Sequence, residues 1–211
     1  MSQGKEVWRL LRIELEAIAA LRGCEPHQRL KGAGSFLQVE PRLHKEALFQ
    51  IQEQMGIELP DSYAHFLTEF GNGFSSNNYQ IGQILPLEEV LKYSVGNKTA
   101  DFPHVIAWTP DIDDTSVQLQ PGEPDKRNVE HWMDWYFDDF HLSGSLRIED
   151  IGCGYFRQLV VSGPGRNQLW EDNRAADCGI VPTTWQGAIA EFSSYYENAV
   201  SRILKDLRGR A

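Results

Sequence analysis

The spacing of apolar residues along this chain changes from helical to strand-like and back to helical, and that order limits the folds available to it. Helical spacing is present at 5–22, 42–55, 61–70 and 184–207. Two strand-like runs, 156–161 and 168–171, are separated by the turn sequence 163–167. Antiparallel strands can be joined by a tight turn, whereas parallel strands need a long crossover. The order therefore predicts an α+β fold, with a mainly antiparallel sheet packed by N-terminal and C-terminal helices.

The first 41 residues differ in pattern from the rest of the chain. The apolar helical stripe over 5–22 ends at Gly23. Residues 24–41 are interrupted by prolines and glycines, which break regular structure. We therefore expect an N-terminal helical arm and linker over 1–41, followed by a single α+β domain over 42–211.

Shorter patterns predict the remaining elements. Strands are expected at 79–85, 104–108 and 115–120. Helices are expected at 86–92, where Pro86 stands in the first turn, and at 129–142. The apolar stripe of the second of these consists of Val129, Met133, Tyr136, Phe137 and Phe140. The last helix is expected to begin at Thr184, with Trp185 and Ile189 at the start of its stripe.

Two motifs carry a family resemblance. The first reads Leu59-Pro60-Asp61-Ser62-Tyr63-Ala64-His65-Phe66-Leu67 and continues as Phe70-Gly71-Asn72-Gly73. The second reads Ile151-Gly152-Cys153-Gly154 and is followed by the hairpin with Gly165, Leu169 and Trp170. Together they resemble the SUKH superfamily, which includes fungal regulators of cell-wall assembly and many bacterial toxin-immunity proteins. The resemblance spans about residues 42–205 and implies a SUKH-like domain that binds other proteins.

The residues of the first motif can also be explained by their physical properties, without the family resemblance. Pro60 can begin a helix because its missing N–H would have no helical partner there. Tyr63 and Phe66 are expected to dock that helix onto the sheet. Gly71 and Gly73 are expected to adopt positive φ where the chain leaves the helix. We therefore expect these residues to build the fold rather than to react.

Acidic residues are concentrated in the middle of the chain. The net charge is −10, and residues 101–150 contain twelve acidic and three basic residues. The negative electrostatic potential of such a segment repels phosphate backbones and speeds association with a basic protein. We therefore expect a basic protein partner and no nucleic acid ligand.

Aromatic and acidic side chains are interleaved within 129–142. The candidate partner-binding residues are Trp132, Asp134, Trp135, Tyr136, Asp138 and Asp139. Aromatic anchors with steering charges around them are typical of protein interfaces. The alternative is that the aromatic side chains form core while the acids lie on the solvent side of the same helix.

One short motif points to catalysis instead. Asp111-Ile112-Asp113-Asp114-Thr115 matches the D-x-D-x-T pattern of haloacid-dehalogenase-type phosphatases. In that chemistry the first Asp attacks phosphorus and the second acts as acid and base beside Mg²⁺. Pro110 interrupts the approach from a strand, and β-α-β units are missing from the surrounding pattern. A magnesium-dependent phosphohydrolase using Asp111 and Asp113 is thus a remote alternative, and we expect no catalytic residue, metal or cofactor.

The N-terminus and the cysteines favour a cytoplasmic protein. Charged residues interrupt the first twelve positions, unlike a secretory signal, and no apolar run is long enough to cross a bilayer. Cys24, Cys153 and Cys178 are odd in number and widely spaced, which argues against a disulfide framework. With the resemblance, we expect an immunity protein that neutralises a basic, nuclease-type toxin. The alternative is a regulatory or scaffold protein of the same superfamily.

Overall fold

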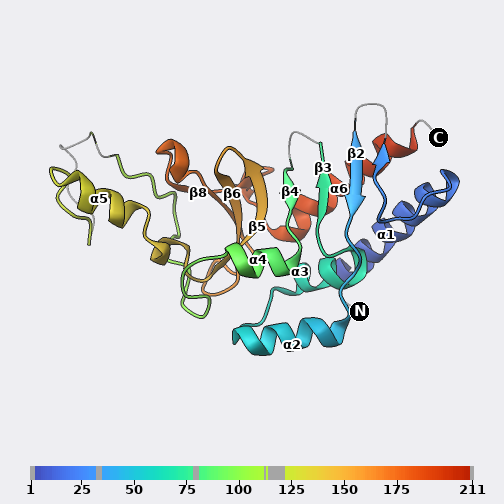
Figure 1. Cartoon of the computed structure of the whole chain (residues 1–211), viewed down its shortest axis with the longest axis horizontal. Helices are drawn as coiled ribbons and strands as arrows, with labels where there is room; N and C mark the ends of the chain where they lie inside the picture. Colours follow the sequence, from blue (N-terminus) through green and yellow to red (C-terminus); the bar gives the residue numbers. More distant parts are fainter. Residues whose placement is uncertain (1–2, 32–34, 78–80, 112, 114–121, 210–211) are drawn as a thin grey trace.

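The computed structural model describes residues 3–31, 35–77, 81–111, 113 and 122–209 (Figure 1). Its α-helices are α1 (Gln3–Leu21), α2 (Lys45–Met55), α3 (Asp61–His65), α4 (Leu87–Tyr93), α5 (Val129–Tyr136) and α6 (Phe192–Arg208). A π-helical turn at Phe66–Phe70 extends α3, and 3-10 turns lie at Asp139–Leu142 and Arg174–Ala176. The strands are β1 (Leu30–Lys31), β2 (Phe36–Val39), β3 (Phe74–Ser76), β4 (Gln83–Ile84), β5 (Ser145–Gly152), β6 (Tyr155–Val160), β7 (Leu169–Asp172), β8 (Ile180–Pro182), β9 (Thr184–Trp185) and β10 (Ala188–Ile189).

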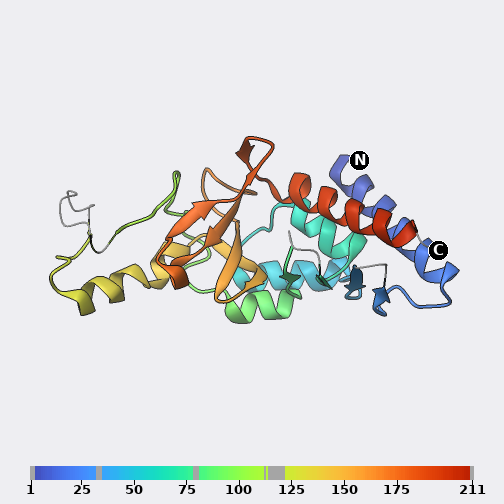
Figure 2. The same ribbon diagram turned by 90° about the horizontal axis from the view of Figure 1, so that it is seen from above.

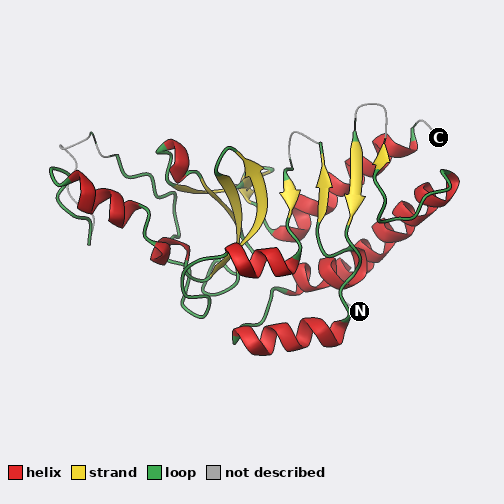
Figure 3. Ribbon diagram, viewed as in Figure 1, coloured by secondary structure: helices red, strands yellow, loops and turns green. Residues whose placement is uncertain are grey.

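The sheet confirms the predicted α+β class. Its eight described strands lie in chain order from β1 to β8, and each neighbouring pair is antiparallel. The longest pair, β5 and β6, runs from Ser145 opposite Val160 to Gly152 opposite Tyr155. Strands β9 and β10 form a separate two-stranded ribbon. Helices from both ends of the chain flank the sheet (Figure 3).

The main core joins the N-terminal and C-terminal helices to the sheet. Helices α1 and α6 lie side by side (Figure 2). Trp8 on α1 is fully buried, with its ring centroid 5.1 Å from Phe66 and 6.1 Å from Phe192. Residues 24–41 were expected to be an irregular linker, and that is wrong for Leu30–Lys31 and Phe36–Val39, which pair with each other. Phe36–Val39 also pair with β3. Alternate residues of this short run are buried, and this burial supports a strand between the glycines and the proline.

The first motif residues build the core, as their pattern predicts. The buried members are Leu59, Pro60, Tyr63, Phe66, Leu67, Phe70, Gly71, Asn72 and Gly73. Gly73 has the predicted positive φ, 101°. The prediction for Gly71 is wrong, because its φ of 175° is extended backbone. Glycine is required there for space, since a Cβ would lie 2.3 Å from Val39 Cγ1 and 2.7 Å from the Glu40 carbonyl oxygen.

The predicted hairpin is present as β6 and β7, and both of its faces are covered. Leu159 and Leu169 belong to the main core, whereas Val160 and Trp170 belong to a second core on the opposite face. Successive side chains of a strand point to opposite faces, so this alternation places one core on each face of the hairpin. The glycine turn of the second motif joins β5 to β6, with Gly152 at φ 100° and Gly154 at φ 83°.

Several predicted strands differ from the structure. Residues 104–107 are irregular, and Trp108 makes an isolated antiparallel bridge to Ile180 on β8. The strand expected at 79–85 is reduced to Gln83–Ile84 within the described residues, and 79–80 lie outside them. The strand expected at 115–120 also lies outside the described residues. The helix expected at 86–92 is confirmed as α4.

The start of the C-terminal helix is another correction. Helix α6 begins at Phe192 rather than at Thr184, because 184–189 form the β9–β10 ribbon. The ribbon turns at Gln186 and Gly187, which have φ of 52° and 82°. A left-handed pair of this kind suits a tight hairpin and cannot lie within an α-helix.

Candidate functional site

The second core supports a lobe at the end of the molecule that carries α5 (Figures 1 and 2). We call it the aromatic lobe, and its buried residues are Phe102, Trp108, Trp132, Tyr136, Leu142, Val160, Trp170 and Ile180. The Tyr136 ring stacks between Trp132, at 4.9 Å, and Trp108, at 5.3 Å between centroids. Offset stacking of this kind adds to the free energy gained by burying the rings. The lobe is therefore a packed support rather than a loose extension.

Helix α5 is present, but it buries a different face from the one predicted. The Asn128 side chain accepts a hydrogen bond from His131 N at 3.3 Å and caps the start of the helix. Of the predicted apolar stripe, Tyr136 is buried and the other four residues are exposed: Val129 by 56%, Met133 by 36%, Phe137 by 44% and Phe140 by 45%. Trp132 and Tyr136 face inward instead, since they bury more apolar area than Val129 and Met133 would.

The predicted helix over 129–142 also ends early. Helix α5 stops at Tyr136, and the chain turns before a 3-10 turn at Asp139–Leu142. The Asp138 side chain accepts a hydrogen bond from Phe140 N at 2.8 Å and caps this turn. The change of direction places Asp138, Asp139 and Phe140 at the surface directly after α5.

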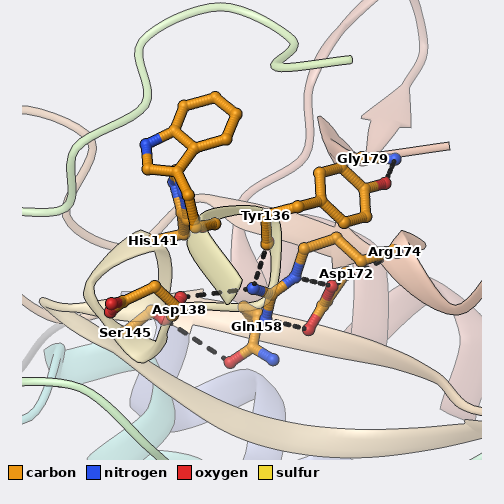
Figure 4. A network of polar contacts seen from close by, with 9 residues as sticks. Tyr136, Asp138, His141, Ser145, Gln158, Asp172, Arg174 and Gly179 are labelled. Atoms are coloured by element: carbon orange, nitrogen blue, oxygen red, sulfur yellow. Dashed lines mark hydrogen bonds and ion pairs between the residues drawn. The ribbon is translucent and has the colours of Figure 1, made fainter. Parts of the chain in front are cut away.

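Arg174 links the end of α5 to β7 through hydrogen bonds (Figure 4). Its Nε and Nη2 donate to the two carboxylate oxygens of Asp172 at 2.8 and 3.0 Å. Its Nη1 donates to the carbonyl oxygens of Tyr136 at 3.1 Å and Asp138 at 3.3 Å. On the other side, the Tyr136 hydroxyl oxygen accepts a hydrogen bond from Gly179 N at 3.0 Å. The last carbonyl of α5, that of Tyr136, is thus satisfied by a buried side chain.

The outer surface of the lobe combines apolar and acidic side chains. We define the α5 surface as Met133, Asp134, Phe137, Asp138, Asp139 and Phe140, all of which are exposed. Of the six predicted partner-binding residues, the three aspartates lie on this surface, and Trp135 is half-buried. Trp132 and Tyr136 lie inside the lobe, exposed by 2% and 0%. The exposed aromatic side chains of 129–142 are therefore Phe137 and Phe140.

Two histidines are enclosed by the lobe. The rings of His104 and His141 lie 5.6 Å apart between centroids, and Trp108 is 4.0 Å from His141. His141 Nε2 is 3.0 Å from the Trp135 carbonyl oxygen, which assigns the proton to Nε2. Among the described residues, the buried His141 Nδ1 and His104 Nε2 atoms have no hydrogen-bond partner. Burial holds the pKa of both histidines at about 4, with Arg174 acting in the same direction on each.

Acidification is expected to destabilise the protein through these histidines. At pH 7 both states are neutral at His104 and His141, whereas between pH 6.5 and about 4 only the unfolded chain binds protons there. The free energy of unfolding is therefore expected to fall with falling pH, by about 1–3 kcal/mol at pH 4.5 after allowance for partial exposure. Asp172 and Asp138 face the pair and reduce this loss. Urea denaturation at a series of pH values measures it.

The double variant His104→Gln/His141→Gln serves to assign the pH dependence. Its slope of unfolding free energy against pH is expected to be shallower than that of the wild type, whatever its stability at pH 7. His27→Gln, at an exposed histidine, is the matched control and is expected to keep the wild-type slope. Equal slopes for all three proteins would remove the histidine pair as the cause.

The phosphatase-like aspartates lie on the rim of the same lobe. Asp111 and Asp113 line an open cleft of about 450 Å³ with Trp132 and Asp177. Asp113 N donates to Asp111 Oδ1 at 2.9 Å, which turns the chain locally. The chain enters this motif from the isolated antiparallel bridge at Trp108 rather than from a parallel strand. Among the described side chains, no group of three or more His, Cys, Asp or Glu could hold a metal ion.

A second cleft, of about 620 Å³, lies at the other end of the molecule and differs in charge. Its side chains of positive charge are Arg12, Arg42 and Lys45, and His27 and His44 also line it. Glu46 and Glu69 also line it, and Lys5 lies 3.5 Å from Glu69. This cleft has three side chains of positive charge and two of negative charge, so it lacks the acidic excess of the α5 surface, and a basic partner would be attracted to the lobe instead.

Comparisons with known proteins give no functional assignment, so an assignment has to rest on the fold and the aromatic lobe. No protein-family model matches the chain, and no curated protein matches it either. Within the described ranges, no helix is long and apolar enough to cross a membrane. The class that the structure defines is an α+β domain with an eight-stranded antiparallel sheet flanked by helices from both ends of the chain.

Proposed function

We propose that the chain is a cytoplasmic, non-catalytic binding domain of the SUKH type that neutralises a basic, nuclease-type toxin through the α5 surface. The observation that carries this proposal is the exposure of Phe137 and Phe140 beside Asp134, Asp138 and Asp139. Exposed aromatic side chains cost free energy in water unless a partner covers them. The carboxylates around them favour a partner of positive charge.

The packed rings and hydrogen bonds beneath the α5 surface favour binding, because they hold this surface in place. Arg174 and the stacked rings of the lobe hold the end of α5 in one arrangement before any partner arrives. A preformed surface loses less conformational entropy on association than a mobile one. A nuclease needs a basic face for its phosphate substrate, and an acidic, rigid surface can cover that face.

A regulatory or scaffold protein of the same superfamily would use the same kind of surface. The two proposals differ in the partner rather than in the chain. A captured nuclease whose activity the chain inhibits supports immunity. A captured protein without such activity supports the scaffold.

Charge removal on the α5 surface is expected to weaken partner capture. The test variant is Asp134→Asn/Asp138→Asn/Asp139→Asn, in which the amide oxygen introduced at position 138 keeps an acceptor for Phe140 N. Immobilised wild type is expected to retain a basic protein from lysates of the source organism and its competitors at about 50 mM salt and to release it at about 500 mM. The dissociation constant is expected to rise about 10–100-fold in the variant, because steering and pairing charges are lost.

The matched control carries the same change of charge elsewhere. Glu46, Glu53 and Glu58 are exposed on and after α2, and their replacement by Gln is expected to leave capture at the wild-type level. Phe137→Ala tests the apolar part of the surface and is expected to weaken binding about tenfold or more. A partner held equally by the wild type and the triple Asp→Asn variant at both salt concentrations would place the interface elsewhere and overturn the proposal.

A further inference from the structure

The outer face of α1 is apolar although it lies at the molecular surface. Leu10, Ile13 and Leu21 are exposed by 54%, 53% and 77%. Ala17 and Ala20 lie between them on the same face and are also exposed. We call these five residues the α1 stripe. A surface helix of a monomer normally carries polar residues on the face opposite the core, so the α1 stripe is unusual.

The inner face of α1 is already occupied. The buried residues of this helix are Trp8, Leu11, Leu15, Ile18 and Ala19. They pack into the main core against α6 and the π-helical turn at Phe66–Phe70. Rotating α1 to hide the stripe would therefore expose Trp8. A helix that is apolar on both faces is normally buried on both.

The charges that border the stripe are paired within the chain. The ion pairs are Glu6–Arg9, Arg12–Glu16 and Glu14–Arg208, each at 2.8 Å. The stripe itself contains no charged residue. This surface is therefore close to neutral in a chain whose net charge is −10. A partner that is itself strongly acidic meets no repulsion here, unlike at the α5 surface.

We propose that the α1 stripe is the contact between two copies of this chain, with the two α1 helices packed antiparallel about a two-fold axis. Two copies share the charge of −10, so they associate best through a neutral surface. The stripe is also complementary to itself in size. With the axis between Ile13 and Ala17, each Ile13 lies opposite the small Ala17 of the second copy, and each Leu10 lies opposite Ala20 and Leu21.

This association leaves the proposed toxin-binding surface free. Helices α1 and α5 lie at opposite ends of the molecule (Figures 1 and 2). The dimer would therefore present two α5 surfaces pointing away from each other. The inference goes beyond the proposed function and does not depend on it, because it rests on different residues and is measured without any toxin.

The test is the mass of the full chain in solution, measured by sedimentation velocity from about 10 μM to about 1 mM protein. The wild type is expected to move from the mass of one copy to that of two. Ile13→Glu is expected to raise the dissociation constant of the dimer about 100-fold or more, because like charges then meet near the axis. Phe49→Glu is the matched control. Phe49 is exposed by 59% on α2, outside the stripe, and its variant is expected to dimerise as the wild type does.

Mixing two variants tests the symmetry. Ile13→Glu and Ile13→Lys are each expected to stay monomeric, and their equimolar mixture is expected to regain the mass of two copies, because the charges on the two sides of the axis are then opposite. Far-UV circular dichroism of each variant checks that the fold is kept. A wild type that remains monomeric up to about 1 mM would overturn the proposal. So would a wild-type dimer that Ile13→Glu leaves intact, or a mixture that does not regain mass.

Discussion

Replacing Trp8 with alanine is expected to lower the free energy of unfolding by about 3–5 kcal/mol. The indole is fully buried and contacts Phe66, Phe70 and Phe192, with ring centroids at 5.1, 5.5 and 6.1 Å. Its removal leaves a cavity between α1, the π-helical turn and α6. Urea denaturation followed by far-UV circular dichroism measures the loss as a lower midpoint with an unchanged slope.

Two further variants test whether the loss of stability comes from the buried indole ring. Arg9→Ala, one residue along on the exposed side of α1, is expected to change stability by less than about 0.5 kcal/mol. Trp8→Phe keeps most of the apolar contact and removes an indole N–H that has no hydrogen-bond partner among the described residues, so it is expected to cost less than Trp8→Ala. A wild-type midpoint for Trp8→Ala would mean that α1 is an arm that contributes little to the core, as the sequence pattern over 1–41 suggests.

Local periodicity predicted the elements whose apolar face is determined by neighbours in the sequence. The helix at 5–22, the helix that opens at Pro60 and the hairpin of β6 and β7 were all predicted near their observed positions. In each, the side chains that repeat at 3.6 or 2 residues are those that enter a core. The antiparallel order followed from the short turns between the strands.

Strand β5 was missed because charged residues interrupt its short apolar alternation at Leu146 and Ile148. It contains Glu149, which is fully buried and binds the Arg157 guanidinium and the Tyr196 hydroxyl. Tyr196 is contributed by α6, 47 residues further along the chain. Burial of a carboxylate depends on such distant partners, so spacing within 145–152 could not reveal the longest strand of the sheet.

The face of α5 was mispredicted for a related reason. Both faces of this helix contain large apolar residues, and periodicity ranks them almost equally. Which face is buried depends on Trp108 and Trp170, which come from other segments and pack with Tyr136 in the second core. A partner-binding site within 129–142 stays a prediction, and the exposure of Phe137 and Phe140 in that segment could be seen only in the structure.

Arg174 was also missed, and the sequence shows why. The pattern Asp-x-Arg occurs at Asp125–Arg127, Asp172–Arg174 and Asp206–Arg208, and the first two of these pairs differ in burial. The first pair is exposed, with the Arg127 side chain 87% accessible, whereas both side chains of the second are less than 10% accessible. The same three-residue pattern thus serves as a surface pair in one place and as the support of α5 in the other.

Arg174→Met is expected to lower the free energy of unfolding by about 3–5 kcal/mol, because it leaves the Asp172 carboxylate buried without its partner. It also removes the donor that holds the Tyr136 and Asp138 carbonyl oxygens. Amide hydrogen exchange in α5 is therefore expected to accelerate more than exchange in β6. Arg127→Met removes the matched exposed pair and is expected to leave both measurements unchanged.

A double variant separates the two effects of losing Arg174. In Arg174→Met/Asp172→Leu the unpaired buried charge is gone, so stability is expected to recover by about 1–3 kcal/mol relative to Arg174→Met alone. The Tyr136 carbonyl oxygen at the end of α5 still lacks its Arg174 donor, so exchange in α5 is expected to remain fast. Recovery of both quantities would show that Arg174 merely neutralises Asp172. Recovery of stability without protection of α5 would show that the guanidinium fixes the end of the helix on which the α5 surface is built.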